Sequence, residues 1–286
     1  MLIRTNDYRT QAFCNQSLIK MQKREVVIKI EDLVKRFENR TVLDGVNLEI
    51  FRGETFVVIG GSGCGKSTLL RHMIGSLKPD SGRVCLLGRD ITDLYGDELD
   101  GVRMKIGMSF QSSALFDSMT VAENVSLALK EHTRLQQSVI DIIVKMKLEL
   151  VGLRGFEDLM PSELSGGMRK RVGLARAIAM DPEIIFYDEP TSGLDPIAQA
   201  VIDRLIIDLS KKLSVTSVVV THDMKSAMAI ADKIAMLYNG KILFVGTSSQ
   251  IEKSKDEVIQ QFISGRHDGP IRFFKRKDDY LDHLVE

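Results

Sequence analysis

A glycine-rich segment between an apolar run and a helical pattern constrains the fold of this chain most strongly. Residues 60–67 read Gly-Gly-Ser-Gly-Cys-Gly-Lys-Ser and match the pattern GxxxxGK[ST] at every fixed position. The apolar run Thr55–Ile59 predicts a strand buried on both faces of a sheet, and Ser67–Ser76 follow a helical pattern. Glycines let the backbone curl so that its N–H groups point at phosphate oxygens, and a helix N-terminus favours the same anion. The sequence therefore predicts a phosphate-binding loop, whereas a chance glycine-rich turn would not explain the flanking strand and helix.

The side chains of this loop indicate what it binds. Lys66 is expected to reach the β- and γ-phosphates of a nucleotide, and the Ser67 hydroxyl is expected to ligate Mg²⁺. The predicted nucleotide contacts come from the loop and the start of its helix: Gly60, Gly61, Ser62, Gly63, Cys64, Gly65, Lys66, Ser67 and Thr68.

A second apolar run, Glu183–Tyr187, ends in two acids. Ligands of open α/β sheets bind beyond the carboxyl ends of the strands, so Asp188 is placed to hold Mg²⁺ through water. Glu189 is expected to polarise an attacking water as a general base. His222 follows a third predicted strand, Ser217–Thr221, and is expected to contact the γ-phosphate and hold that water. An acidic turn and a structural histidine are the plainer interpretations, but the phosphate loop favours the catalytic one.

The remaining pattern alternates strands and helices. Val26–Ile30 and Val46–Ile50 predict strands, with Asp44-Gly45 as a break between them. Residues 115–160 follow a mostly helical pattern, and 169–180 predict a further helix. Residues 233–244 predict a hairpin that turns at Asn239-Gly240.

Composition excludes several classes of protein. Lys and Arg total 39, as do Asp and Glu, and this balance disfavours a generally basic nucleic-acid-binding protein. None of Cys14, Cys64 and Cys85 lies in a CxxC pair, which disfavours a zinc site or a disulfide framework. No apolar run approaches the roughly 18 residues that span a bilayer. Residues 1–20 are polar and do not form a secretory signal.

Further motifs occur in the order found in one family. Residues 164–168 read Leu-Ser-Gly-Gly-Met, residues 192–195 read Ser-Gly-Leu-Asp, Gln111 follows Phe110, and Phe37 lies 23 residues before Gly60. With these motifs the chain resembles the ATP-binding subunit of an ABC transporter. The resemblance implies that Phe37 stacks on adenine and that Gln111 contacts the nucleotide and Mg²⁺. It also implies an α/β fold of the P-loop NTPase type, with a RecA-like core sheet, an N-terminal antiparallel β-subdomain and an inserted helical subdomain.

The resemblance also implies domain limits. We expect an ABC ATPase domain at residues 25–251, with the helical subdomain at about 112–163, and a C-terminal extension at 252–286. Residues 1–24 would be an N-terminal extension that is disordered or precedes the true start.

Proteins of this family dimerise head to tail, so that each ATP lies between one subunit's phosphate loop and the other's signature motif. In this chain the signature residues are Ser165, Gly166 and Gly167, whose amides would open a second helix N-terminus that favours an anion. Asp195 is expected near the same interface. A single chain would then hold only half of each site.

A narrower resemblance points to the cargo. Residues 164–172, the segment Gln111–Val121, Tyr187 before Asp188, and Asp268–Phe273 look like the ATPase of Mla-type phospholipid transporters. Met168 stands where most ABC proteins have Gln. The resemblance implies ATP and Mg²⁺ as cofactors, and a second ATPase subunit, a membrane permease and an MCE-domain lipid-binding protein as partners. It implies a peripheral position on the cytoplasmic face of the inner membrane, and no nucleic acid.

Two alternatives remain open at this stage. One is an ABC ATPase that serves another importer or exporter of small solutes. The other is a soluble ABC ATPase that acts on nucleic acid or ribosomes, although two ATPase cassettes, a long coiled coil and zinc cysteines are absent from the sequence. The basic stretch Arg272–Lys277 is either a solvated charge run or a contact with a partner.

Overall fold

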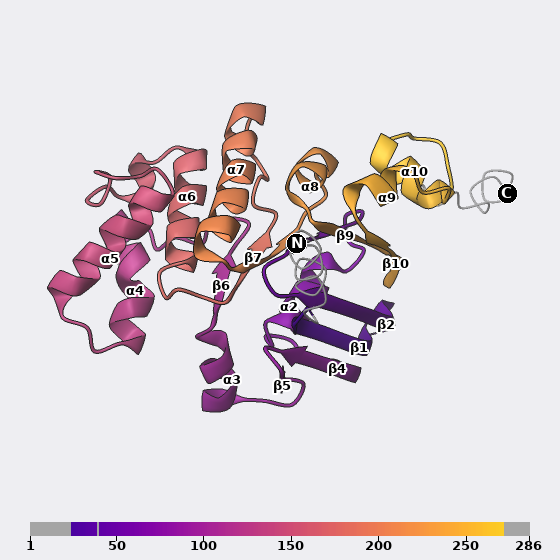
Figure 1. Cartoon of the computed structure of the whole chain (residues 1–286), viewed down its shortest axis with the longest axis horizontal. Coiled ribbons are helices and arrows are strands. Elements are labelled where there is room, and N and C mark those ends of the chain that lie inside the picture. Colours follow the sequence, from indigo (N-terminus) through magenta and orange to yellow (C-terminus); the bar gives the residue numbers. More distant parts are fainter. Residues whose placement is uncertain (1–23, 39, 272–286) are drawn as a thin grey trace, which may run out of the picture.

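The computed structural model describes residues 24–38 and 40–271, and within them two sheets organise the fold (Figure 1). The larger sheet has six strands in the order β10-β9-β3-β8-β7-β6, and the smaller has four in the order β2-β1-β4-β5. In the larger sheet as described, β3, β6, β7, β8 and β9 run parallel and β10 pairs antiparallel with β9, whereas the strand pairs of the smaller sheet are antiparallel. A mostly parallel sheet beside an antiparallel one is the predicted architecture, and the predicted α/β fold class is confirmed.

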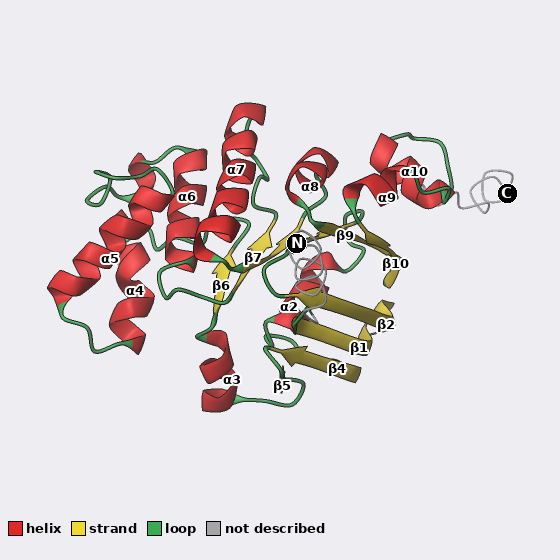
Figure 2. Cartoon of the chain, viewed as in Figure 1, coloured by secondary structure: helices red, strands yellow, loops and turns green. Residues whose placement is uncertain are grey.

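The strands and helices alternate along the chain (Figure 2). The strands are β1 (Val26–Phe37), β2 (Arg40–Phe51), β3 (Thr55–Ile59), β4 (Ser81–Leu86), β5 (Arg89–Asp90), β6 (Ile106–Ser109), β7 (Ile184–Asp188), β8 (Thr216–Val220), β9 (Lys233–Tyr238) and β10 (Lys241–Gly246). The helices are α2 (Lys66–Met73), α3 (Gly96–Arg103), α4 (Val121–His132), α5 (Gln137–Leu150), α6 (Gly166–Ala177), α7 (Pro196–Leu213), α8 (Met224–Ile230), α9 (Ser248–Glu252) and α10 (Glu257–Ser264), with a 3₁₀ turn at Pro161–Glu163.

The central strands divide two hydrophobic cores between their faces. In β3, Val57 and Ile59 pack in the core beneath α4 to α8, whereas Phe56 and Val58 pack in the core shared with the small sheet and α2. All five residues of β3 are buried. The continuous apolar run therefore forms a strand covered on both faces, as the sequence predicts.

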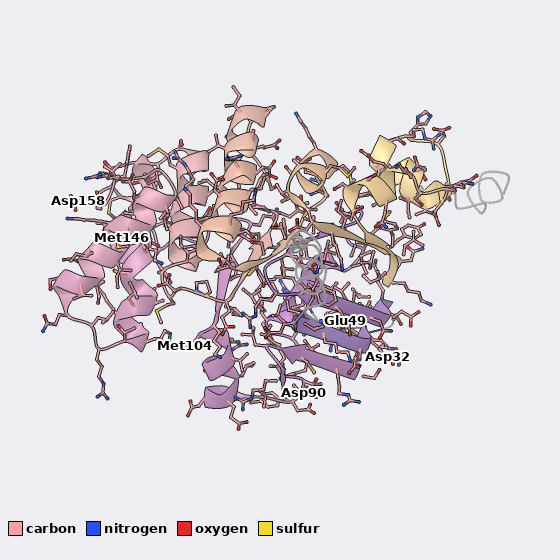
Figure 3. All side chains as sticks on the ribbon, in the orientation of Figure 1. Asp32, Glu49, Asp90, Met104, Met146 and Asp158 are labelled. Atoms are coloured by element: carbon pink, nitrogen blue, oxygen red, sulfur yellow. The ribbon has the colours of Figure 1, made fainter. Side chains whose placement is uncertain are left out.

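The helices α4 and α5 and the small sheet lie at different ends of the molecule. In Figure 3, Met146 on α5 and the nearby Asp158 lie at one side, and Asp32 on β1 and Glu49 on β2 lie at the other. The six-stranded sheet runs between them, and the phosphate loop follows its interior strand β3 at the carboxyl ends of the parallel strands. None of the helices among residues 24–38 and 40–271 is long and apolar enough to cross a bilayer.

Several predicted boundaries were wrong. The break at Asp44-Gly45 lies inside β2, where Gly45 has a φ of +68° and the pairing with β1 shifts register. The helix predicted at 67–76 ends at Met73, and the one predicted at 169–180 begins at Gly166 and ends at Ala177. The helical stretch at 115–160 resolves into two helices, α4 and α5, with turns around them. The predicted hairpin is present as β9 and β10, joined at Asn239-Gly240.

The expected termini fall partly outside the described residues. Residues 1–23 and 272–286, which include the basic stretch Arg272–Lys277, lie outside them. The domain limits at 25–251 and 112–163 stay predictions. Within the expected C-terminal extension, the Gln261 side chain accepts a hydrogen bond from the Ile271 N–H at 2.7 Å and ties the end of the described chain to α10.

Candidate functional site

The phosphate loop connects β3 to α2. Gly60 and Gly65 have φ values of +156° and +109°, and a Cβ at Gly65 would lie 3.0 Å from the Val42 carbonyl oxygen. Glycine is therefore required at this turn on both conformational and steric grounds. The helix α2 has no side-chain cap at its N-terminus, so the first N–H groups of the helix are open to an anion.

Lys66 folds back on the main chain of its own loop. Its ammonium donates to the carbonyl oxygens of Gly60 at 2.8 Å and Gly61 at 3.1 Å, and the residue is 8% exposed. These contacts hold the cation against the loop that is predicted to bind phosphate. The rest of the predicted set lies in the same segment: Ser62, Gly63 and Cys64 in the loop, and Ser67 and Thr68 in the first turn of α2.

Ser67 and Asp188 come together from two different elements. The Ser67 hydroxyl donates to a carboxylate oxygen of Asp188 at 3.4 Å, across the gap between α2 and the end of β7. Burial raises the pKa of Asp188, and the negative charge of Glu189 adds to that rise. A hydroxyl and a carboxylate are hard oxygen donors, and Mg²⁺ in nucleotide sites is held by one or two such groups together with phosphates. The donor set therefore fits Mg²⁺.

Gln111, the third residue predicted to bind the metal, points elsewhere. Its amide donates to the Ser192 hydroxyl at 3.5 Å and, among the described residues, makes no hydrogen bond to Ser67 or Asp188. The residue follows β6, which is the neighbour of β7 in the sheet, so its main chain lies at the same sheet edge. A contact between the Gln111 side chain and Mg²⁺ stays a prediction.

Glu189 is buried and held at several points. Its carboxylate accepts a hydrogen bond from the Thr221 hydroxyl at 3.2 Å and lies 2.9 Å from Nδ1 of His222. Its backbone has a φ of +47°, and its N–H donates to the Val220 carbonyl oxygen at 2.8 Å. Glu189 is 8% exposed. The structure thus brings together the two residues predicted to be catalytic, with the histidine against the carboxylate.

Two residues in this region had no assigned role in the sequence prediction. The Thr221 hydroxyl contacts the Glu189 carboxylate, and the Lys170 ammonium donates to the carbonyl oxygens of Gln111 at 2.5 Å and Glu189 at 3.3 Å. Lys170 belongs to the signature run at 164–172, but its partners lie 59 and 19 residues away in the sequence. No local spacing therefore signals its contacts.

The signature residues begin α6. Ser165 is the N-cap of this helix, and its hydroxyl accepts a hydrogen bond from the Met168 N–H at 3.2 Å. Ser165 and Gly166 are exposed. The helix packs against α4, α5, α7 and β6, whereas α2 packs against β2, β4, β7 and β8. The signature motif and the phosphate loop therefore belong to different packing units of one chain.

The last two predicted nucleotide contacts lie near the surface. Asp195 is the N-cap of α7, and its carboxylate accepts hydrogen bonds from the Ile197 and Ala198 N–H groups at 2.9 and 3.1 Å. Phe37 ends β1, is 45% exposed, and has the Lys35 ammonium 5.5 Å from its ring centroid. An exposed aromatic ring near the phosphate loop is available for stacking on a base, but the stacking itself stays a prediction.

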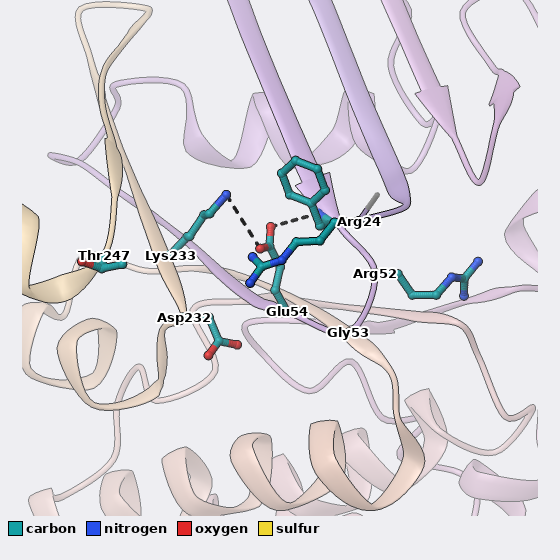
Figure 4. Close-up of a pocket in the computed structure, with 8 residues that line it drawn as sticks. Arg24, Arg52, Gly53, Glu54, Asp232, Lys233 and Thr247 are labelled. Atoms are coloured by element: carbon teal, nitrogen blue, oxygen red, sulfur yellow. Dashed lines mark hydrogen bonds and ion pairs between the residues drawn. The ribbon is translucent and has the colours of Figure 1, made fainter. Parts of the chain in front are cut away.

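A separate cavity of about 470 Å³ lies at the amino end of β3, away from the phosphate loop (Figure 4). Its central residue is Glu54, one carboxylate oxygen of which accepts from the Phe51 N–H at 2.9 Å. The other oxygen is buried without a hydrogen bond among the described residues, 4.0 Å from the Lys233 ammonium. Burial raises the pKa of Glu54.

The sequence is similar to known ATP-binding proteins of transport systems. The ABC transporter family matches residues 43–192. The intermembrane phospholipid transport system ATP-binding protein MlaF of Haemophilus influenzae is 44% identical over 91% of this chain and 98% of its own length. The probable ribonucleotide transport ATP-binding protein mkl of Mycobacterium leprae is 41% identical over 89% of this chain and 73% of its own length.

A solved structure is similar over most of the fold. The dimeric ATP-binding cassette MJ0796, bound to ADP and Pi in a post-hydrolysis state, superimposes with a TM-score of 0.71 at 33% identity. The match covers 77% of this chain and 98% of that one.

Proposed function

The chain belongs to the ABC transporter family of ATP-binding proteins, and we propose that it powers phospholipid transport between bacterial membranes. It is an ATPase of that family. The observation that carries the proposed cargo is the 44% identity to MlaF over nearly the full length of both chains. The motifs at 111–121 and 164–172, which first suggested this type of transporter, support it.

We propose that this chain's own residues divide the work as follows. The loop amides and the Lys66 ammonium bind and orient the β- and γ-phosphates. Glu189 takes a proton from the attacking water, and His222, 2.9 Å from its carboxylate, holds that carboxylate or the water in place. Ser67 and Asp188 would hold Mg²⁺, which when bound offsets the charge that develops on the phosphates.

We propose that nucleotide is sandwiched between two copies of this chain. The exposed N-terminus of α6, which does not pack against α2 among the described elements, supports the proposal, since Ser165 and Gly166 would otherwise face solvent. The similarity to a cassette solved as a dimer supports it further. Phe37 and Asp195 would complete the nucleotide contacts at this interface.

The proposed assembly includes a membrane permease and an MCE-domain lipid-binding protein, with this chain peripheral at the cytoplasmic face of the inner membrane. The name of MlaF, a transport system component, supports the permease. The lipid would cross the bilayer through that partner. No nucleic acid is proposed as a partner.

The experiment that tests the proposal measures cargo directly. The chain is co-purified with its membrane permease, reconstituted in vesicles, and assayed for ATP-dependent transfer of fluorescent phospholipid to acceptor vesicles. Transfer with wild-type chain, and its loss with Glu189→Gln, supports the proposal.

A ribonucleotide cargo is the second candidate, because mkl is 41% identical. Uptake of labelled ribonucleotide by the same vesicles, without lipid transfer, would replace the proposed cargo with this one.

A further inference from the structure

Lys170 is a buried lysine on the signature helix α6. It is 7% exposed, whereas its neighbour Arg169 reaches the Leu164 carbonyl oxygen at 2.7 Å on the surface side of the helix. Arg171, the next residue, donates to the Gly152 carbonyl oxygen at 3.0 Å. A buried ammonium is unfavourable unless hydrogen bonds or opposite charges compensate it, so the contacts of Lys170 require an explanation.

Those contacts join the ends of two adjacent strands. The ammonium donates to the carbonyl oxygen of Gln111, which follows β6, at 2.5 Å, and to that of Glu189, which follows β7, at 3.3 Å. The two strands are parallel neighbours, so both carbonyls lie at the same edge of the sheet. One cation therefore holds the main chain at the two positions where the site places its predicted metal contact and its predicted general base.

The charge of Lys170 matters as well as its hydrogen bonds. Burial lowers its pKa, and the carboxylates of Glu189 and Asp188 oppose that effect. A neutral side chain would make a hydrogen bond to one carbonyl but would not offset the negative charges of the Glu189 and Asp188 carboxylates. The cation also holds the carbonyl of Glu189, whose backbone is in the left-handed region.

We propose that Lys170 is a positioning residue for ATP hydrolysis, which holds the main chain of Gln111 and Glu189 so that the Glu189 carboxylate meets the attacking water. The inference rests on the proposed role of Glu189 as general base. It assigns Lys170 to the catalytic step, because among the described residues its ammonium donates to the carbonyl oxygens of Gln111 and Glu189 and makes no hydrogen bond to the phosphate loop.

The test compares Lys170→Met with Lys170→Arg. Lys170→Met removes the charge-assisted hydrogen bonds to the main chain of Gln111 and Glu189. It should lower kcat about 10- to 100-fold, with ATP affinity within about twofold of wild type. Lys170→Arg keeps the cation and should retain several-fold more turnover than Lys170→Met. Turnover and calorimetric ATP affinity are measured on each variant, together with its melting temperature.

A matched control is Lys147→Met. Lys147 is another buried lysine, 6% exposed on α5, which pairs with Asp181 away from the site. This variant should lose stability and keep its kcat. If Lys147→Met lowers kcat as much as Lys170→Met, or if Lys170→Arg is no better than Lys170→Met, the positioning role is wrong. If Lys170→Met does not fold, Lys170→Gln takes its place in both comparisons.

A mixed dimer assigns the effect to a chain. In a pair made of a Ser165→Arg chain and a Lys66→Ala chain, the intact site takes its Gln111 and Glu189 from the first chain. Lys170→Met should lower activity more in that chain than in the other, and the reverse order would overturn the proposal. Glu189→Gln is assayed in parallel: if it is inactive while Lys170→Met is normal, the proposed function stands and only the role of Lys170 fails.

Discussion

At the scale of single residues, the site depends on a carboxylate that two neighbouring side chains hold in place. The Glu189 carboxylate is already in contact with Thr221 and His222, so little rearrangement separates this arrangement from one that polarises a water. Preorganised groups of this kind avoid the cost of reorientation during the reaction.

Glu189→Gln keeps the shape of this side chain and removes the base. Hydrolysis should fall about 10²- to 10⁴-fold while ATP still binds, and the ATP-bound dimer should accumulate. Phosphate release and size-exclusion chromatography with ATP measure the two effects. Near-normal turnover would remove Glu189 from the mechanism.

Lys66→Ala acts earlier, on binding itself. The substitution removes a charge-assisted contact with phosphate, and we expect ATP affinity to fall by at least about tenfold. Calorimetry with ATP and Mg²⁺ checks this. Lys147→Met, which also removes one positive charge, is the control. An unchanged affinity would mean that the loop amides alone carry the binding.

At the scale of elements, the turn between β2 and β3 contains the buried acid Glu54. Its ionisation makes the stability of the folded state depend on pH. The folded state raises the pKa of Glu54 through burial, so it favours the protonated carboxyl. The resulting stabilisation is present below the ordinary pKa and is lost as the pH rises through the folded value.

Glu54→Gln should therefore gain stability over wild type as the pH rises. Gln still accepts from the Phe51 N–H, and it stays neutral in the folded state. The difference in melting temperature should be near zero at about pH 4 and grow towards pH 7, by about 2–4 °C for each kcal/mol. A difference that shrinks or reverses with pH would show that the attraction of Lys233 outweighs burial.

Elements were predictable where a local pattern survives in the chain. β3, β7 and β8 each contain a continuous run of apolar residues, and the hairpin turn at Asn239-Gly240 has its own signal. β1 was predicted at less than half its length, because register shifts after Ile30 and Leu33 break the alternation that marks a strand.

The residues of the site also fall into those that a local motif predicts and those that it does not. The phosphate loop and the acids after β7 are local motifs, and the structure brings Ser67 against Asp188 and Glu189 against His222. Lys170 was not predicted, because its contacts depend on how α6 crosses the ends of β6 and β7. Sequence spacing does not encode such a crossing.

At the scale of the whole molecule, one chain carries two half-sites, and their pairing can be tested by mixing. Ser165→Arg blocks the signature end of α6, and Lys66→Ala weakens the phosphate loop, so each homodimer carries its lesion in both sites. A mixed dimer collects both lesions in one site and leaves the other intact. If nucleotide is sandwiched head to tail, the mixture should recover ATPase activity that neither parent shows.

Each mutant paired with wild type sets the attainable level, since two closely linked sites can be obligately coupled. Activity in these wild-type mixtures, with none in the mixture of the two mutants, would contradict the intermolecular role of Ser165.

The left-handed backbone of Glu189 has a consequence for how this chain can evolve. A glutamate at a φ of +47° carries strain of about 1–3 kcal/mol, which Asn or Gly at the same position would largely relieve. Thermal robustness and turnover are therefore opposed at this position. Variants selected only for thermal stability should acquire Asn or Gly at residue 189 and lose hydrolysis, whereas selection for transport should retain the strained glutamate.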